Sequence, residues 1–246
     1  HLFTHAFFKA LLFLGSGSVI HAFKDEQDIR LMGGVWKKLP YTWILMIIGT
    51  LALTGFPFLS GFYSKDAIIE FAYLKNSSFG NIAVFIGILT AFLTSIYSWR
   101  LIIKTFHGKY LNKDISIIKI QESPVIMIVP LIILSIGSIF SGYLFKDLFI
   151  GETSSILFWK DSIKFLSVFD HHHLPLWIIA ITPILVLISI PISFYLFIKK
   201  KTFLSNIIKK NNFFYNFLLN KWYFDELYDF LFVLPLKKSG SFLWKK

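Results

Sequence analysis

The chain has 246 residues, of which 55% are hydrophobic and only 16% are charged, and its mean hydropathy is +0.65. A soluble domain carries about a quarter charged residues, so this composition excludes an ordinary soluble enzyme and predicts an all-α integral membrane protein. The net charge of +11 comes from lysines and arginines between apolar runs, a pattern that orients membrane proteins; we expect the lipid bilayer as a partner and no nucleic acid. The absence of cysteine excludes a thiolate metal site or an iron–sulfur cluster bound by this chain.

Five apolar runs are each long enough to cross a bilayer, which takes about 20 residues. After them, charges interrupt every apolar stretch, so the tail should form an amphipathic helix lying along the membrane or on partner helices. The alternative for the tail is a plain amphipathic anchor. We therefore predict a transmembrane core over 1–200 and an interfacial segment over 201–246. The five runs are 2–22, 43–74, 79–103, 125–145 and 174–198.

Lysine and arginine concentrate in the first, third and fifth connections between or after these runs. The second connection carries essentially Lys75 alone, and the fourth offsets its lysines with Asp and Glu. This alternation predicts that the first, third and fifth connections face the cytoplasm or the mitochondrial matrix. The chain starts at His1 inside an apolar pattern and has no signal-peptide features, so we interpret its start as a fragment boundary.

The second run contains the segment GFPFLSGFYSKD, residues 55–66, which breaks the apolar pattern. Its glycines and proline leave helical backbone groups unpaired, which a membrane tolerates only where protein or water supplies partners. We predict a discontinuous helix, with Ser64 capping its second half and Asp66 in the first turn of that half. Lys65 lies beside the break, where an ionisable residue indicates a functional site. The alternative is a helix-end lysine that extends to the membrane surface.

His1, His5 and Lys9 are spaced i, i+4 and i+8 in the first run. At about 100° per residue they share one helix face. Three ionisable groups on one face imply a hydrated or paired interior, and histidine exchanges protons near neutral pH. The spacing predicts a proton relay; for His1 the alternative is a position near the membrane surface.

The triplet His171-His172-His173 invites a metal interpretation, but adjacent histidines do not share a helix face and no carboxylate spacing supports them. We expect them on a loop surface and predict no metal site. The sequence also lacks a phosphate loop, a nucleophile elbow and a dinucleotide fingerprint.

Several motifs together resemble one family: HLFTHAFFKALLFL (1–14), EQDIRLMGG (26–34), GFPFLSGFYSKD (55–66), SWRLIIKTFHGK (98–109) and KWYFDELYDFLF (221–232). They are similar to the proton-pumping subunit 5 (subunit L in bacteria) of NADH–quinone oxidoreductase, respiratory complex I. The resemblance runs through essentially the whole chain and is weakest over 146–173. The EQDIRLMGG loop and the YFDELYD tail separate it from the shorter antiporter-like subunits of the same complex.

This resemblance implies that the chain holds the later part of the membrane core and the start of a lateral helix, from about Lys221, without the early helices. It places His1, His5 and Lys9 on the central proton path and Lys65, with Asp66 beside it, as the exit-side proton carrier. NADH, FMN, iron–sulfur clusters and quinone would be bound by other subunits, and none by this chain. The implied partners are the other membrane-arm subunits.

The implied location is the bacterial inner membrane, or the mitochondrial inner membrane if the chain is organellar. Two other functions remain open. One is the large subunit of a multi-subunit Na⁺/H⁺ antiporter, which shares this core but against which the loop and tail motifs argue. The other is a non-pumping structural fragment in which the tail acts as a clamp.

Overall fold

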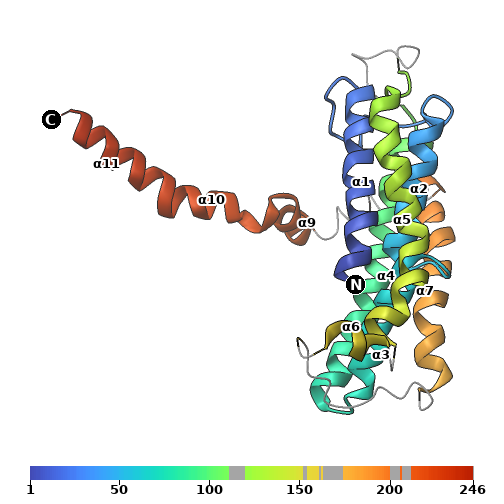
Figure 1. Cartoon of the computed structure of the whole chain (residues 1–246). Coiled ribbons are helices and arrows are strands. Elements are labelled where there is room, and N and C mark those ends of the chain that lie inside the picture. Colours follow the sequence, from blue (N-terminus) through green and yellow to red (C-terminus); the bar gives the residue numbers. More distant parts are fainter. Residues whose placement is uncertain are drawn as a thin grey trace. The chain divides into compact units, whose positions relative to one another are not determined.

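The computed structural model describes residues 1–110, 120–151, 154–160, 162, 174–199, 206 and 212–245. Contacts divide the chain into two compact units, His1–Lys199 and Lys200–Lys246. The first unit is a bundle of helices (Figure 1). Its α-helices are α1 (Leu2–Ala22), α2 (Pro40–Thr54), α3 (Ser60–Leu74), α4 (Ser78–Ile102), α5 (Val125–Ile150), α6 (Ser154–Trp159) and α7 (Leu176–Phe194).

Within the described residues, four helices are long and apolar enough to cross a membrane: Leu2–Ala22, Ser78–His107, Val125–Ile150 and Leu176–Lys199. Two of them, α4 and α7, are extended at their ends by a short π-helical turn. The remaining predicted span is α2 and α3, two half-helices of 15 residues each. At about 1.5 Å per residue neither half alone crosses a hydrocarbon core of about 30 Å, but the two together do. The all-α membrane fold with a discontinuous second span is therefore confirmed.

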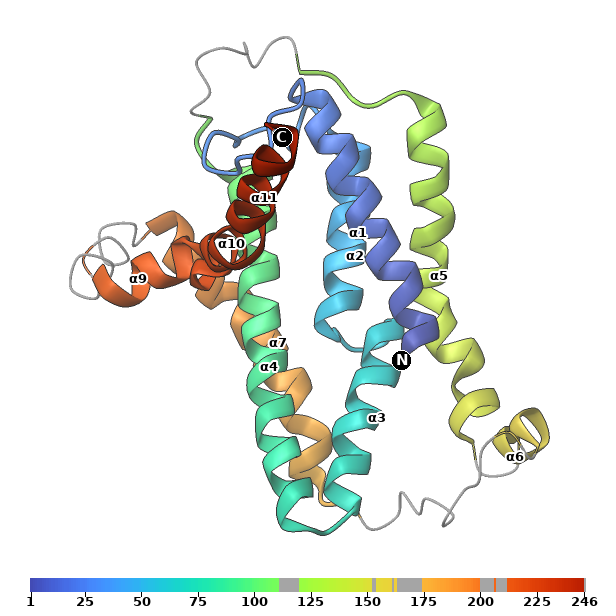
Figure 2. The ribbon, with the colours of Figure 1, turned by 90° about the vertical axis from the view of Figure 1, so that its left-hand side faces the viewer.

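The helices pack so that α5 contacts α1, α2 and α3, while α4 contacts α3 and α7. Figure 2 shows α3 continuing below α2, with the start of the chain beside the junction of the two half-helices. Helices α4 and α7 run parallel in a fixed register. Val84 clusters with Ile178, and the hydroxyls of Ser95 and Ser189 share a hydrogen bond. The tightest helix pairs therefore involve segments far apart in the sequence.

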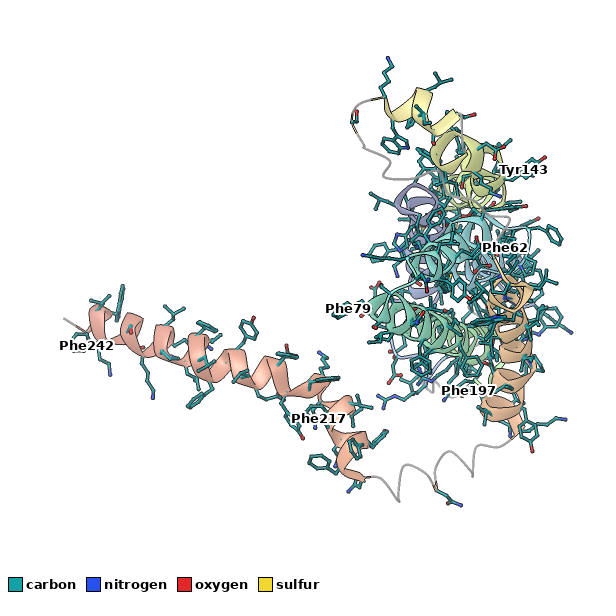
Figure 3. The ribbon with its side chains drawn as sticks, turned by 90° about the horizontal axis from the view of Figure 1, so that it is seen from below. Phe62, Phe79, Tyr143, Phe197, Phe217 and Phe242 are labelled. Carbon is teal, nitrogen blue, oxygen red and sulfur yellow. The ribbon has the colours of Figure 1, made fainter. Side chains whose placement is uncertain are left out.

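The bundle buries small polar residues and exposes large apolar ones. The side chains of Ser18, Ser138 and Ser189 are fully buried between helices, whereas Phe79 and Tyr143 stand out from its perimeter (Figure 3). Lipid tails are as apolar as leucine, so transmembrane helices are held together by close packing and hydrogen bonds more than by the hydrophobic effect. Polar residues inside the bundle and apolar residues on its perimeter are the arrangement expected of helices surrounded by lipid.

The connection after the first span and the start of the connection after the third span lie at one end of the bundle. The backbone N–H of Trp36 donates to the carbonyl of Phe106 at 3.3 Å, and a Cβ on Gly33 would lie 2.5 Å from the Lys109 carbonyl oxygen. The end of the fifth span also contacts the end of the third, at His107. The described parts of the first and third connections and the end of the fifth span therefore lie at the same end of the bundle, as an alternating topology requires. The side of the membrane that they face stays a prediction.

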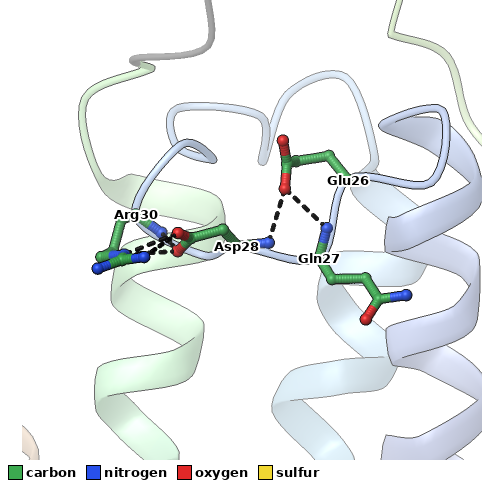
Figure 4. A network of polar contacts seen from close by, with 4 residues as sticks. All are labelled: Glu26, Gln27, Asp28 and Arg30. Atoms are coloured by element: carbon green, nitrogen blue, oxygen red, sulfur yellow. Dashed lines mark hydrogen bonds and ion pairs between the residues drawn. The ribbon is translucent and has the colours of Figure 1, made fainter. Parts of the chain in front are cut away.

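Inside the first connection, a short polar network shapes the loop (Figure 4). Glu26 accepts the backbone N–H groups of Gln27 and Asp28, and Arg30 Nε donates to both carboxylate oxygens of Asp28. This hydrogen bond from Arg30 holds the pKa of Asp28 below its usual value. The contact therefore contributes stability above the ordinary pKa of an aspartate and loses it as the pH falls through the lowered value.

The start of α2 is capped by a residue from a distant connection. Leu39, at the cap position, has no side-chain acceptor. Glu122 supplies it, accepting from the backbone N–H groups of Tyr41 at 2.9 Å and Thr42 at 3.3 Å and from the Thr42 hydroxyl. The Thr42 hydroxyl also lies 3.2 Å from that of Ser18. This network ties α1, α2 and the start of α5 together at one end of the bundle.

Replacing Glu122 with alanine should destabilise this end of the bundle, because the buried Thr42 loses its acceptor. We expect a loss of about 1–3 kcal/mol, the cost of leaving a buried polar group unsatisfied. Thermal unfolding of the purified complex that contains the chain would measure it. Glu226→Ala, at an exposed position of the second unit, is the matched control, and equal melting temperatures for the two variants would contradict the capping role.

The second unit is helical, as expected for the tail. It contains α9 (Asn212–Leu219), α10 (Phe224–Tyr228) and α11 (Leu234–Trp244). Between α9 and α10 the residues Lys221–Tyr223 have positive φ values, which turns the chain sharply. Its described side chains are nearly all exposed, including aromatic residues along its length. A role as an interfacial or lateral helix stays a prediction.

Candidate functional site

The break between α2 and α3 is a turn whose polar groups are largely satisfied by protein. Helix α2 ends at Gly55, which has a φ of +82°. The N–H groups of Gly55 and Phe56 donate to the carbonyls of Ala52 and Leu51, at 3.2 and 3.0 Å. Only glycine adopts such a left-handed conformation without strain. A membrane-spanning segment can therefore be interrupted here without leaving these helix-end groups unpaired in hydrocarbon.

Glycine also sets how closely the elements meet at the break. A Cβ on Gly61 would lie 1.8 Å from the carbonyl oxygen of Ala52, and one on Gly142 would lie 2.5 Å from the Cα of Ser60. No real side chain fits at these distances. The first turn of α3 therefore touches the last turn of α2 on one side and α5 on the other.

The predicted helix cap at Ser64 is wrong. Helix α3 begins at Ser60, with Leu59 at its cap position, because Phe58, with a φ of +70°, already completes the turn that starts at Gly55. Ser64 lies in the second turn of α3 and Asp66 lies beyond the first turn. The Ser64 hydroxyl is therefore free to reach α1.

Lys65 and Asp66 are adjacent in sequence but have different surroundings. The alkyl chain of Lys65 lies against the end of α2, where a Cβ on Gly55 would be 3.7 Å from its Cδ. This contact places the side chain of Lys65 beside the partially negative end of α2; the proton-carrier role and the alternative of a lysine extended to the membrane surface both stay predictions. Asp66 is only 7% exposed, and its carboxylate oxygens have no hydrogen-bond partner among the described residues.

The predicted stripe on α1 is divided between two neighbours. The rings of His1 and His5 lie 5.7 Å apart, and His1 Nδ1 is 2.9 Å from the Ser64 hydroxyl on α3. Lys9 instead lines a groove of about 210 Å³ with residues of α2 and α4, including Thr50. The histidine end of the stripe therefore contacts the half-helix that carries Lys65, while Lys9 faces the other half-helix.

Sequence reasoning missed the hydroxyl groups that join these elements. The Thr4 hydroxyl on α1 lies 2.8 Å from that of Ser64, and both residues line a small cavity together with the buried Ser141 of α5. Small polar residues in apolar helices were the available signal, but they are also common at helix interfaces without such a role. The histidine triplet 171–173 lies outside the described residues, and among the described ones no group of three or more His, Cys, Asp or Glu side chains could hold a metal ion.

Gly61→Ala tests whether the close contact at the break positions the site. We expect α3 to move away from α2 and the chain to lose about 1–3 kcal/mol of stability, the usual cost of overpacking. Gly17→Ala is the matched control, because nothing lies within 4 Å of a Cβ there and alanine is the better helix former by about 1 kcal/mol. Thermal unfolding of both variants measures this, and equal stability would show that the contact is not tight.

Comparison with known proteins shows which proteins the chain is similar to. The family described as "NADH:quinone oxidoreductase/Mrp antiporter, TM" matches residues 1–94. The chain is 46% identical to "NADH-ubiquinone oxidoreductase chain 5" of Chondrus crispus over 98% of its length, and 46% identical to the protein of that name from Phytophthora infestans over 100%. It spans 37% and 38%, respectively, of the lengths of these relatives. Residues 1–94 therefore belong to the antiporter-like membrane family shared by NADH:quinone oxidoreductases and Mrp antiporters, and the chain as a whole is similar to a part of the chain 5 proteins.

Proposed function

We propose that the chain is part of the proton-translocating membrane subunit of an NADH:quinone oxidoreductase. The observation that carries this proposal is the interrupted membrane span whose break holds the side chain of Lys65 against Gly55. Broken helices in membrane transport proteins place helix ends and unwound backbone at the site where ions bind. The names of the similar proteins support the assignment to this enzyme. The ionisable residues at the break support the assignment of proton transfer to this chain.

In this proposal the proton carriers are His1, His5, Lys9, Lys65 and Asp66. His1 and His5 are one helical turn apart, about 6 Å; His1 contacts Ser64 of α3, while Lys9 lines the groove with residues of α2. Protons move between these groups through interior water as conformational or electrostatic changes alter which groups hold charge. Because Lys65 lies beside the break, a movement of α2 against α3 changes the electric field of the helix ends at its ammonium group.

The remaining chemistry of the enzyme belongs elsewhere in this proposal. NADH, FMN, iron–sulfur clusters and quinone are bound by other subunits, so this chain contributes to a translocase without carrying a redox centre. Its partners are other membrane-arm subunits, contacted by the core and by the helices of the second unit. The eukaryotic sources of the similar proteins favour the mitochondrial inner membrane over the bacterial one.

A cation/proton antiporter is the second candidate, because the matching family also includes Mrp antiporters. The two functions differ in what they require. Sodium-dependent transport by the assembled protein, without quinone reductase activity, would favour the antiporter. Proton transport coupled to NADH oxidation would favour the oxidoreductase subunit.

Lys65→Ala and Lys9→Ala, each made in the intact subunit within its complex, should lower the number of protons moved per electron. The physical reason is that alanine can neither hold nor release a proton at these positions. Proton uptake by vesicles, measured together with NADH oxidation, gives this ratio. Lys38→Ala, at an exposed lysine of the first connection, is the control. An unchanged ratio and unchanged turnover in both variants would overturn the proposed function.

A further inference from the structure

A small cavity of about 120 Å³ lies between α1, α3 and α5. Its lining combines several phenylalanines with polar and ionisable side chains, which are His1, Thr4, Tyr63, Ser64, Ser141 and Lys146. The Ser141 hydroxyl is buried and has no hydrogen-bond partner among the described residues. A cavity of this size and polarity can hold ordered water, which needs two to four polar partners. The polar side chains of the cavity wall therefore surround a place where a proton can be exchanged.

Hydrogen-bond accounting at Ser64 determines which nitrogen of His1 carries a proton. The Thr4 hydroxyl donates its one proton to the His1 carbonyl, at 3.0 Å. Thr4 can then only accept from Ser64, at 2.8 Å, so the Ser64 proton points toward Thr4. His1 Nδ1, 2.9 Å from the same Ser64 oxygen, must therefore be the donor. The hydrogen bond at one ring nitrogen sets the protonation of the other.

We propose that Ser64 is a positioning residue that holds His1 as the Nδ1–H tautomer, so that Nε2 is the nitrogen that takes up and releases the translocated proton. The inference rests on the proposed function and adds to it the tautomer of His1 and the residue that fixes it. A proton that arrives at Nε2 makes the imidazolium, and its release from Nε2 restores the starting tautomer. No covalent bond other than N–H changes, and Ser64 keeps its own proton.

The alternative use of the Ser64 proton does not change this result. Ser64 also lies 3.2 Å from the carbonyl oxygen of Ser60 in its own helix, and donation there still leaves Nδ1 as the only group that can donate between His1 and Ser64. The proposal requires only that Ser64 accepts from His1. A substitution that removes the Ser64 hydroxyl therefore tests the proposal.

Ser64→Ala, in the intact subunit within its complex, tests the proposal. We expect proton-coupled turnover to fall about tenfold, the factor that one lost hydrogen bond of ordinary strength produces, and its pH profile to shift because His1 is free to change tautomer. Ser64→Thr, which keeps the hydroxyl, should restore both. Ser138→Ala is the control, because that buried hydroxyl bonds only the Leu134 carbonyl of its own helix among the described residues.

Lys65→Ala, run in parallel, separates the two proposals. If Lys65→Ala loses proton transport while Ser64→Ala keeps the wild-type rate and pH profile, the role of Ser64 is overturned and the proposed function stands. If Lys65→Ala and Lys9→Ala both transport protons normally, the proposed function fails. If Ser64→Ala prevents assembly, Ser64→Val takes its place: it removes the hydroxyl that accepts from His1 while keeping the shape of threonine, and a pH profile equal to that of Ser64→Thr would overturn the role.

Discussion

A helix that stops inside a membrane must find partners for its end groups, and the rest of this structure depends on how that requirement is met. At the junction of α2 and α3 the left-handed Gly55 lets two N–H groups return to the last carbonyls of α2. Gly61 then lets the next half-helix start in contact with the one just ended. Because both devices need a residue without a side chain, the break is a fixed point around which α1, α4 and α5 pack.

Small hydroxyl residues around the break have two roles: some only join helices, and others also contact an ionisable ring. Ser95 and Ser189 hold α4 to α7 away from any ionisable group, as expected where lipid provides no hydrophobic drive for helix association. Thr4 and Ser64 use the same chemistry between α1 and α3 but include His1 in the bond. A hydroxyl that holds two helices together and also contacts a titratable ring couples the packing of the bundle to where a proton resides.

The division of the α1 stripe has a mechanical consequence. His1 is bonded to the half-helix that carries Lys65, whereas Lys9 shares a groove with the other half-helix. A small movement at the break therefore changes the surroundings of the two ends of the stripe independently. In the proposed function the residues that stabilise the break lie beside the proton carriers, so a change that loosens the turn also changes the distances between these carriers.

The sequence by itself determined the spans, the break and the ionisable residues, because hydrophobic run length and glycine or proline punctuation are local properties. It also placed His1, His5 and Lys9 on one face, since that follows from helical periodicity alone. Only the tertiary structure decided where α3 begins, that Lys65 turns back onto Gly55, and that Glu122 caps α2 from a distant connection. These depend on contacts between segments far apart in the chain, and a serine that caps a helix and one that binds a histidine look the same in sequence.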